Sequence, residues 1–278
     1  MIFDAHTHIQ FPAYDADRDE VIQRARAAGV KMIAAGTQAG TSRDAMMLAE
    51  QYPEDVWATV GFHPNHVLPA VARSGSGDAK EGGNQWYHDK SEQRVAVPEV
   101  FDIEKLRKLA AHPKVVAIGE CGLDYYRLIA NREAHIAKQK EIFRAQIALA
   151  KELKKPLVIH ARPSKGTDDA YEDVLSLLSN VNGQMSKVFH FYAGSLSMTK
   201  KLVDAGSYFT FGGVTTFSSD YDESIRAIPM ERLMLETDAP YVAPVPYRGK
   251  RNEPGVSYEE IVKQTTQNVL TVFKIAVS

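Results

Sequence analysis

Two histidines near the start of the chain are spaced so that they could bind one metal ion together. His6 and His8 stand in the segment 2–9, whose residue pattern predicts a β-strand. Side chains of a strand alternate between its two faces, so these two imidazoles point the same way. Neutral imidazoles at this spacing suit a divalent cation. The same pattern arises about as often without a metal, when one ring packs in the fold and the other is solvated.

Further side chains of the metal-ligand type stand at or after later strand-like segments. They are His63, Glu120, His160, His190 and Asp238. A lone histidine at such a place is more often a hydrogen-bonded core residue, but its recurrence at successive strand ends favours a shared metal site. Histidine and carboxylate ligands suit zinc, manganese or magnesium. Two such ions sharing one carboxylate would suit the hydrolysis of a phosphoester.

The elements that must position these residues alternate regularly along the chain. The predicted strands span 2–9, 31–36, 56–61, 115–119, 157–160, 187–191, 208–212 and 233–237. The predicted helices span 19–28, 42–51, 103–112, 135–153, 170–178, 197–205, 222–228 and 258–273. Strands that alternate with helices predict parallel βαβ units.

This alternation predicts the α/β class and a TIM-type (β/α)8 barrel, with an open doubly wound sheet as the rival. The first strand is not followed by a glycine-rich phosphate loop, which disfavours a dinucleotide-binding sheet. The 278 residues suit one barrel domain, which typically needs about 250 residues. We therefore expect a single domain over 1–278, in which the carboxyl ends of the strands converge at one mouth.

One region interrupts the alternation. Residues 72–97 are rich in glycine, serine and charged residues, with Trp86 and Tyr87 as their large aromatic side chains. We interpret 72–97 as a loop inserted after the third strand. One interpretation is a surface loop without a role in the site. The other is a segment that covers the cleft, because it follows the carboxyl end of a barrel strand, where barrel enzymes place their sites.

Composition limits the possible partners. The formal net charge of −2 excludes a strong overall basic field, so contact with a polyanion must be local or depend on bound metal. The single cysteine, Cys121, excludes an intramolecular disulfide and is compatible with a reducing compartment. The chain shows neither a signal peptide nor an apolar run of the roughly 20 residues that span a bilayer. We expect a cytoplasmic protein with no membrane contact and no obligate protein partner.

Several blocks of the chain resemble the TatD family of metal-dependent deoxyribonucleases, from one end of the chain nearly to the other. The blocks are Asp4-Ala5-His6-Thr7-His8, Gly61-Phe62-His63-Pro64, Gly119-Glu120-Cys121-Gly122-Leu123-Asp124-Tyr125-Tyr126-Arg127, Ile159-His160-Ala161-Arg162, Leu235-Glu236-Thr237-Asp238-Ala239-Pro240-Tyr241, Arg248-Gly249-Lys250-Arg251-Asn252-Glu253-Pro254 and Thr265-Thr266-Gln267-Asn268. That family belongs to the amidohydrolase-like barrels. The segment 72–97 departs from it, which puts substrate access and specificity in question.

The resemblance implies a set of metal ligands around two divalent ions, Mg, Mn or Zn, with Glu120 as the bridge between them. The implied ligands are His6, His8, Glu120, His160, His190 and Asp238. It also implies that His63 contacts substrate phosphate. Asp238 and Glu120 are then the catalytic carboxylates, and Asp238 is placed to accept a proton from the attacking water.

Arginines after the strands are candidates to bind phosphate, because a guanidinium group matches two phosphate oxygens at once. They are Arg127, Arg162, Arg248 and Arg251, and a solvated surface charge is the alternative for each. Tyr125 and Tyr126 either stack on a base or pack in the fold.

The resulting hypothesis is a metal-dependent deoxyribonuclease. We expect it to act from a strand end or on single strands, since a net-acidic protein is poorly suited to wrapping a duplex. A hydrolase of another ester or amide, such as an aminoacyl-tRNA deacylase, is the first alternative, because the same centre would serve it. A metal-binding scaffold without turnover is the second, and the accompanying arginines argue against it.

Overall fold

The computed structural model describes residues 1–67, 99–126, 128, 131–181, 183, 185–254 and 259–276, with the backbone alone described for 259–264. The predicted insertion at 72–97 and the candidate phosphate ligand Arg127 lie outside the described residues.

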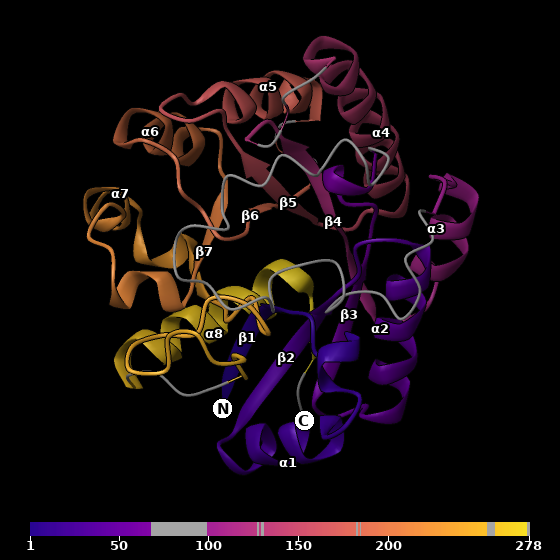
Figure 1. Cartoon of the computed structure of the whole chain (residues 1–278), viewed down its shortest axis with the longest axis vertical. Coiled ribbons are helices and arrows are strands. Elements are labelled where there is room, and N and C mark those ends of the chain that lie inside the picture. Colours follow the sequence, from indigo (N-terminus) through magenta and orange to yellow (C-terminus); the bar gives the residue numbers. More distant parts are fainter. Residues whose placement is uncertain are drawn as a thin grey trace.

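Within the described residues, eight parallel strands pair in chain order and form a nearly closed barrel (Figure 1). The strands are β1 (Ile2–Thr7), β2 (Val30–Ala35), β3 (Val56–Val60), β4 (Val115–Asp124), β5 (Leu157–Arg162), β6 (Lys187–Phe189), β7 (Tyr208–Phe211) and β8 (Leu233–Leu235). Beyond the end of β8, the Asp238 backbone N–H donates to the His6 carbonyl at 2.9 Å, and the His8 N–H donates to the Ala239 carbonyl at 2.7 Å. These bonds join the last strand to the first, and the predicted TIM-type barrel is confirmed.

Helices follow the strands and surround the ring (Figure 1). They are α1 (Arg18–Ala27), α2 (Ala39–Gln51), α3 (Ile103–Ala110), α4 (Arg132–Leu153), α5 (Asp169–Leu178), α6 (Leu196–Asp204), α7 (Asp222–Ala227) and α8 (Glu259–Phe273). Among the described residues, no helix has the length and apolar content needed to cross a membrane.

Some strand ends differ from the sequence prediction. β4 continues past the expected 115–119 to Asp124, because Gly122 pairs with His160 of β5 and Asp124 pairs with Arg162. A Cβ atom at Gly122 would lie 2.0 Å from the His160 carbonyl oxygen, so only glycine permits this close approach. Conversely, β8 ends at Leu235, earlier than the expected 233–237.

A buried apolar layer fills the ring beneath the candidate ligands. It contains Phe3, Ile33, Trp57, Val116, Val158, Val188 and Met234, together with Val269, Val272 and Phe273 of α8. Val158 and Val188 stand one strand period before His160 and His190, so they share the inward face of their strands with those histidines. The barrel interior is therefore a packed core, and its polar chemistry is confined to the carboxyl ends of the strands.

Candidate metal centre

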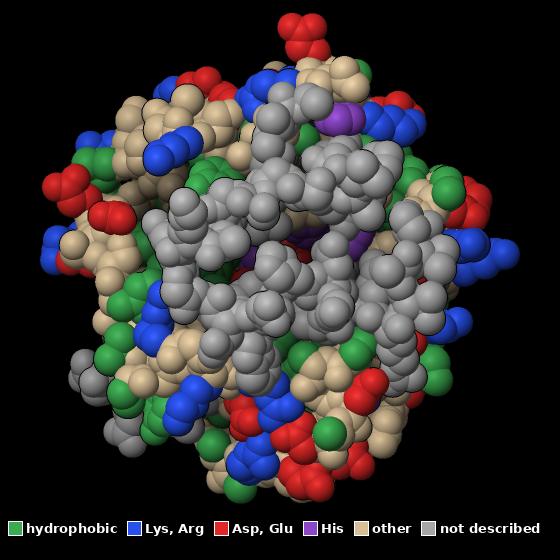
Figure 2. All heavy atoms as spheres, viewed as in Figure 1, with side chains coloured by type: hydrophobic (Ala, Val, Ile, Leu, Met, Phe, Trp, Pro, Cys, Tyr) green, Lys and Arg blue, Asp and Glu red, His purple; other side chains and the backbone are tan. Residues whose placement is uncertain are grey.

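The carboxyl ends of the strands bring the histidines and carboxylates singled out in the sequence to one place. His6 lies in β1, Glu120 in β4 and His160 in β5, while the other candidates stand just beyond a strand end. Those others are His8, His63, His190 and Asp238. Figure 2 shows histidine and acidic side chains in the middle of this face. Residues separated by up to 232 positions in the chain thus share one centre.

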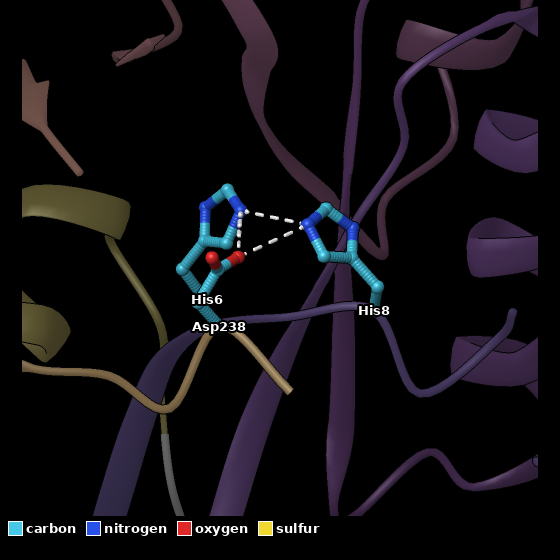
Figure 3. A group of neighbouring side chains, drawn as sticks. All are labelled: His6, His8 and Asp238. Carbon is cyan, nitrogen blue, oxygen red and sulfur yellow. Dashed lines mark hydrogen bonds and ion pairs between the residues drawn. The ribbon is translucent and has the colours of Figure 1, made fainter. Parts of the chain in front are cut away.

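One group of ligand atoms lies around the Oε2 atom of Glu120. This oxygen is 3.3 Å from His6 Nε2 and 3.6 Å from His8 Nε2. The carboxylate of Asp238 completes the group, with its Oδ1 atom 3.3 Å from His8 Nε2 and 3.7 Å from His6 Nε2. In Figure 3 the two rings and the Asp238 carboxylate face one another. Their atoms lie close enough together to hold one cation.

A second group lies around the other oxygen of the same carboxylate. Glu120 Oε1 is 2.9 Å from His190 Nε2, 3.0 Å from His160 Nδ1 and 3.0 Å from His63 Nε2. Each carboxylate oxygen of Glu120 therefore faces its own set of imidazoles. His6, Glu120 and His190 also lie close enough together to hold one cation, as do His63, Glu120 and His160.

The hydrogen bonds of two histidines indicate which ring nitrogens are free to bind metal. His8 Nδ1 lies 2.8 Å from the Ala35 carbonyl, which can only accept, so Nδ1 carries a proton and Nε2 is the nitrogen that faces the centre and would bind a cation once any proton on it is lost. His160 Nε2 donates to Asp124 Oδ2 at 3.2 Å, so Nδ1, which lies 3.0 Å from Glu120 Oε1, is the nitrogen that would bind a cation once its proton is lost. A partner that holds the far nitrogen of a ligand histidine is typical of metal sites. The donor set therefore fits a divalent cation.

His63 has the opposite hydrogen-bond pattern. Its Nδ1 atom accepts a hydrogen bond from the Asn65 backbone N–H at 3.0 Å, so the proton of the neutral ring is on Nε2. Burial lowers the pKa of His63 to about 4, which keeps the ring neutral near pH 7. His63 therefore presents an N–H donor toward Glu120, rather than the lone pair that a metal ion needs.

The carboxylates of the centre remain ionised although they are buried. Burial alone raises the pKa of Glu120, but the positive charge of His190 and hydrogen bonds from His160 and His190 outweigh it, so the pKa lies well below its usual value. Burial opposes ionisation of Asp238 in the same way, and the hydrogen bond and charge of His8 lower its pKa. The centre therefore holds fixed negative charge, which attracts cations.

Asp124 belongs to this centre, although sequence reasoning did not assign it a role. Asp124 is buried. Burial raises the pKa of its carboxyl group, but the hydrogen bond with His160 outweighs that effect and the pKa falls to about 2. A signal was present in the sequence. Glu120 and Asp124 stand four residues apart, so a strand that continued beyond 119 would place both side chains on one face.

We expect Asp124→Asn to weaken metal binding about 10- to 100-fold, because the amide no longer holds the His160 proton on Nε2 as a carboxylate does. Metal titration of the purified variant measures this change. Asp204→Asn, a change at an exposed position of α6, serves as the matched control and leaves the affinity unchanged. An Asp124→Asn affinity equal to that of the unsubstituted protein would show that Asp124 does not orient His160.

Two further buried carboxylates hold the loops that carry ligands. Asp4 accepts hydrogen bonds from the Thr237 backbone N–H at 3.0 Å and from the Thr237 hydroxyl at 2.5 Å, which ties β1 to the segment before Asp238. Glu236 accepts a bond from the Phe191 N–H at 2.8 Å and so fixes the turn directly after His190. Burial raises the pKa of Asp4 to about 7. Neither carboxylate belongs to the groups of ligand atoms around Glu120.

The arginines proposed from the sequence differ in their surroundings. Arg162 lies over the ring of Tyr126 at 4.0 Å, and Arg248 lies over the ring of Phe217 at 3.5 Å. Arg251 instead binds both oxygens of Asp17, donates to Glu253 at 2.9 Å and donates to the Ala13 carbonyl at 2.9 Å. These partners occupy the Nη1 and Nη2 donors of Arg251 and turn its guanidinium group toward the fold instead of toward a substrate phosphate.

The two adjacent tyrosines have different environments. Tyr125 is buried, and its hydroxyl donates to Asp173 Oδ2 at 2.8 Å. Tyr126 is exposed beside Arg162. Tyr125 therefore packs in the fold, while Tyr126 is accessible at the mouth of the barrel.

A protein-family model described as TatD related DNase matches residues 3–264. The chain belongs to the TatD family. The resemblance stated from its motifs is thus confirmed, and this TatD-family protein is a metal-dependent hydrolase.

Relatives of the TatD-family protein match over almost its whole length. It is 34% identical to the uncharacterized metal-dependent hydrolase YabD of Bacillus subtilis (strain 168), over 99% of this chain and 100% of that protein. It is 33% identical to the 3'-5' ssDNA/RNA exonuclease TatD of Klebsiella pneumoniae (strain 342), over 100% of this chain and 99% of that protein. Among solved structures, the TatD homologue YJJV of Escherichia coli K12 superposes with a TM-score of 0.74 at 25% identity, over 99% of this chain and 98% of that one.

Proposed function

We propose that this TatD-family protein hydrolyses phosphodiester bonds of DNA at the Glu120 centre with two divalent ions, from a strand end or on single strands. The observation that carries the proposal is the placement of the two Glu120 oxygens, since Oε2 lies closest to His6 and His8 whereas Oε1 lies closest to His63, His160 and His190. A related protein that bears the name of a 3'-5' ssDNA/RNA exonuclease supports the substrate class.

In this proposal each ion has its own ligands in addition to the shared Glu120. His6, His8 and Asp238 would hold one ion. His160 and His190, whose Nδ1 and Nε2 atoms lie 3.4 Å apart beside Glu120 Oε1, would hold the other. Mg²⁺, Mn²⁺ or Zn²⁺ at these places would supply Lewis-acid polarisation of the phosphoryl group and a water of lowered pKa.

The side chains of the chain itself perform the remaining tasks. Asp238 is ionised, and its carboxylate takes the proton that the attacking water loses. Because the pKa of Asp238 is low, Asp238 is a weak base and would accept a proton only from a water whose own pKa is lowered. His63 donates its Nε2 proton as a hydrogen bond to a phosphate oxygen. Arg162 and Arg248 provide guanidinium groups for the neighbouring phosphates of the strand.

His63→Ala should lower kcat/KM about 10- to 100-fold, which corresponds to the loss of one hydrogen bond to a charged phosphate. Metal content should stay unchanged, because the ring offers a donor rather than a lone pair. Steady-state kinetics and metal analysis of the same preparation measure both quantities. A fall in bound metal in the variant would instead make His63 a ligand.

The proposed function is tested on protein purified without chelator, whose metal content is measured first. Labelled single-stranded DNA, duplex DNA, an ester and amide panel and aminoacyl-tRNA are then supplied with added Mg²⁺ or Mn²⁺. Release of nucleotides from DNA ends supports the proposal. Cleavage of aminoacyl esters without nucleotide release would favour a deacylase, and retained metal without any turnover would favour a binding scaffold.

A further inference from the structure

Exposed aromatic rings stand in the loops that follow three of the barrel strands. Within the described residues, the aromatic side chains classed as exposed are Tyr126 after β4, Phe217 after β7 and Tyr247 after β8, with exposed fractions of 41%, 38% and 57%. All three therefore follow the carboxyl ends of strands, on the same end of the barrel as the metal centre. Single exposed apolar residues are ordinary, but their gathering at one end indicates an interaction surface.

Each of these rings is paired with a cation. The pairs are Arg162 with Tyr126 at 4.0 Å, Arg248 with Phe217 at 3.5 Å and Lys250 with Tyr247 at 5.5 Å, measured to the ring centroid. A cation at this distance is attracted to the ring and restrains it. The surface thus offers flat apolar rings directly beside positive charges.

One hydrogen bond and one charge interaction relate these pairs to each other and to the centre. The Val245 backbone N–H donates to the Thr216 hydroxyl at 3.0 Å, which joins the loop that carries Phe217 to the loop that carries Tyr247. On the other side, the charge of Arg162 acts on buried Asp124, the partner of His160. Phe217 and Tyr247 therefore stand on joined loops, and the cation beside Tyr126 acts on a carboxylate that contacts a candidate ligand.

We propose that Tyr126, Phe217 and Tyr247, each with its cation, bind successive nucleotides of a single-stranded nucleic acid that enters the centre. This inference rests on the proposed function. Single-strand sites combine aromatic rings, on which bases stack, with cations along the phosphate backbone. A duplex hides the faces of its bases and cannot use the rings. The net charge of −2 supplies no global attraction, so the local cations must provide it.

The test measures binding of 5'-labelled oligodeoxythymidylates of increasing length by fluorescence anisotropy, with every protein carrying Asp238→Asn to block turnover. Phe217→Ala combined with Tyr247→Ala should weaken binding of a long strand by about tenfold per ring, and binding of a dinucleotide much less. Phe217→Trp and Tyr247→Phe keep a ring and should retain most of the affinity. Met47→Ala changes an exposed apolar residue of α2 and serves as the control.

Equal affinity of the double alanine variant and its parent for long strands would overturn the inference. An equal loss of affinity for duplex and for single-stranded DNA would also overturn it. So would a double alanine variant that still binds strands but no longer binds anionic lipid vesicles, because that result would indicate a membrane-binding surface. The proposed function fails separately, if protein with Asp238 intact binds strands but releases no nucleotide from any of them.

Discussion

Glu120→Gln is expected to lower turnover about a thousandfold or more, which corresponds to about 4 kcal/mol of transition-state stabilisation. Each oxygen of Glu120 faces a separate group of ring nitrogens, so this one substitution changes both proposed ion sites at once. The amide is neutral, and its NH₂ group would point at nitrogen or metal where an oxygen is required. Two divalent ions would also lose one of the negative charges that balance them.

The measurement combines single-turnover hydrolysis of labelled DNA with metal analysis by mass spectrometry. We expect the variant to bind less metal per chain than the unsubstituted protein while its circular dichroism spectrum stays unchanged. Glu231→Gln, at an exposed glutamate, is the matched control and keeps full activity. Near-normal hydrolysis by Glu120→Gln at saturating metal would remove Glu120 from the proposed mechanism.

Asp238→Asn is expected to reduce kcat about 10²- to 10⁴-fold, the range over which a positioned proton acceptor contributes. Asparagine keeps the shape of the side chain but cannot take the proton of the attacking water. Asp238 has φ of 50°, a left-handed conformation that asparagine also tolerates, so the fold should survive the substitution.

Metal content and activity of Asp238→Asn are measured on one preparation, with Asp204→Asn as the surface control. Partial loss of metal with a much larger loss of kcat is the expected result, because His6, His8 and Glu120 remain around that ion site. A variant that regained full activity with excess metal would show that Asp238 acts as a ligand alone and not as the proton acceptor.

The barrel could be predicted from local patterns. Alternation of strand-like and helix-like segments depends on side-chain periodicity, which is a property of neighbouring residues and needs no tertiary contact. Parallel strands place their carboxyl ends together, so ligand-type residues at those ends, such as His6, His160 and Asp238, were expected to meet. The role of Asp124 was missed because the continuation of β4 depends on pairing with β5, and that register is a contact between distant segments.

The sequence by itself determined which residues could reach the mouth of the barrel, because strand periodicity decides the face on which each side chain lies. Only the tertiary structure decided what each residue does there. The Asn65 N–H makes His63 a donor, and the Ala35 carbonyl turns the His8 Nε2 atom toward the centre as a candidate ligand, although both side chains are histidine. Arg251 is bound by Asp17, which is 234 positions away in the chain. Proton positions and ion pairs depend on atoms within about 3 Å, and only the folded chain brings those atoms together.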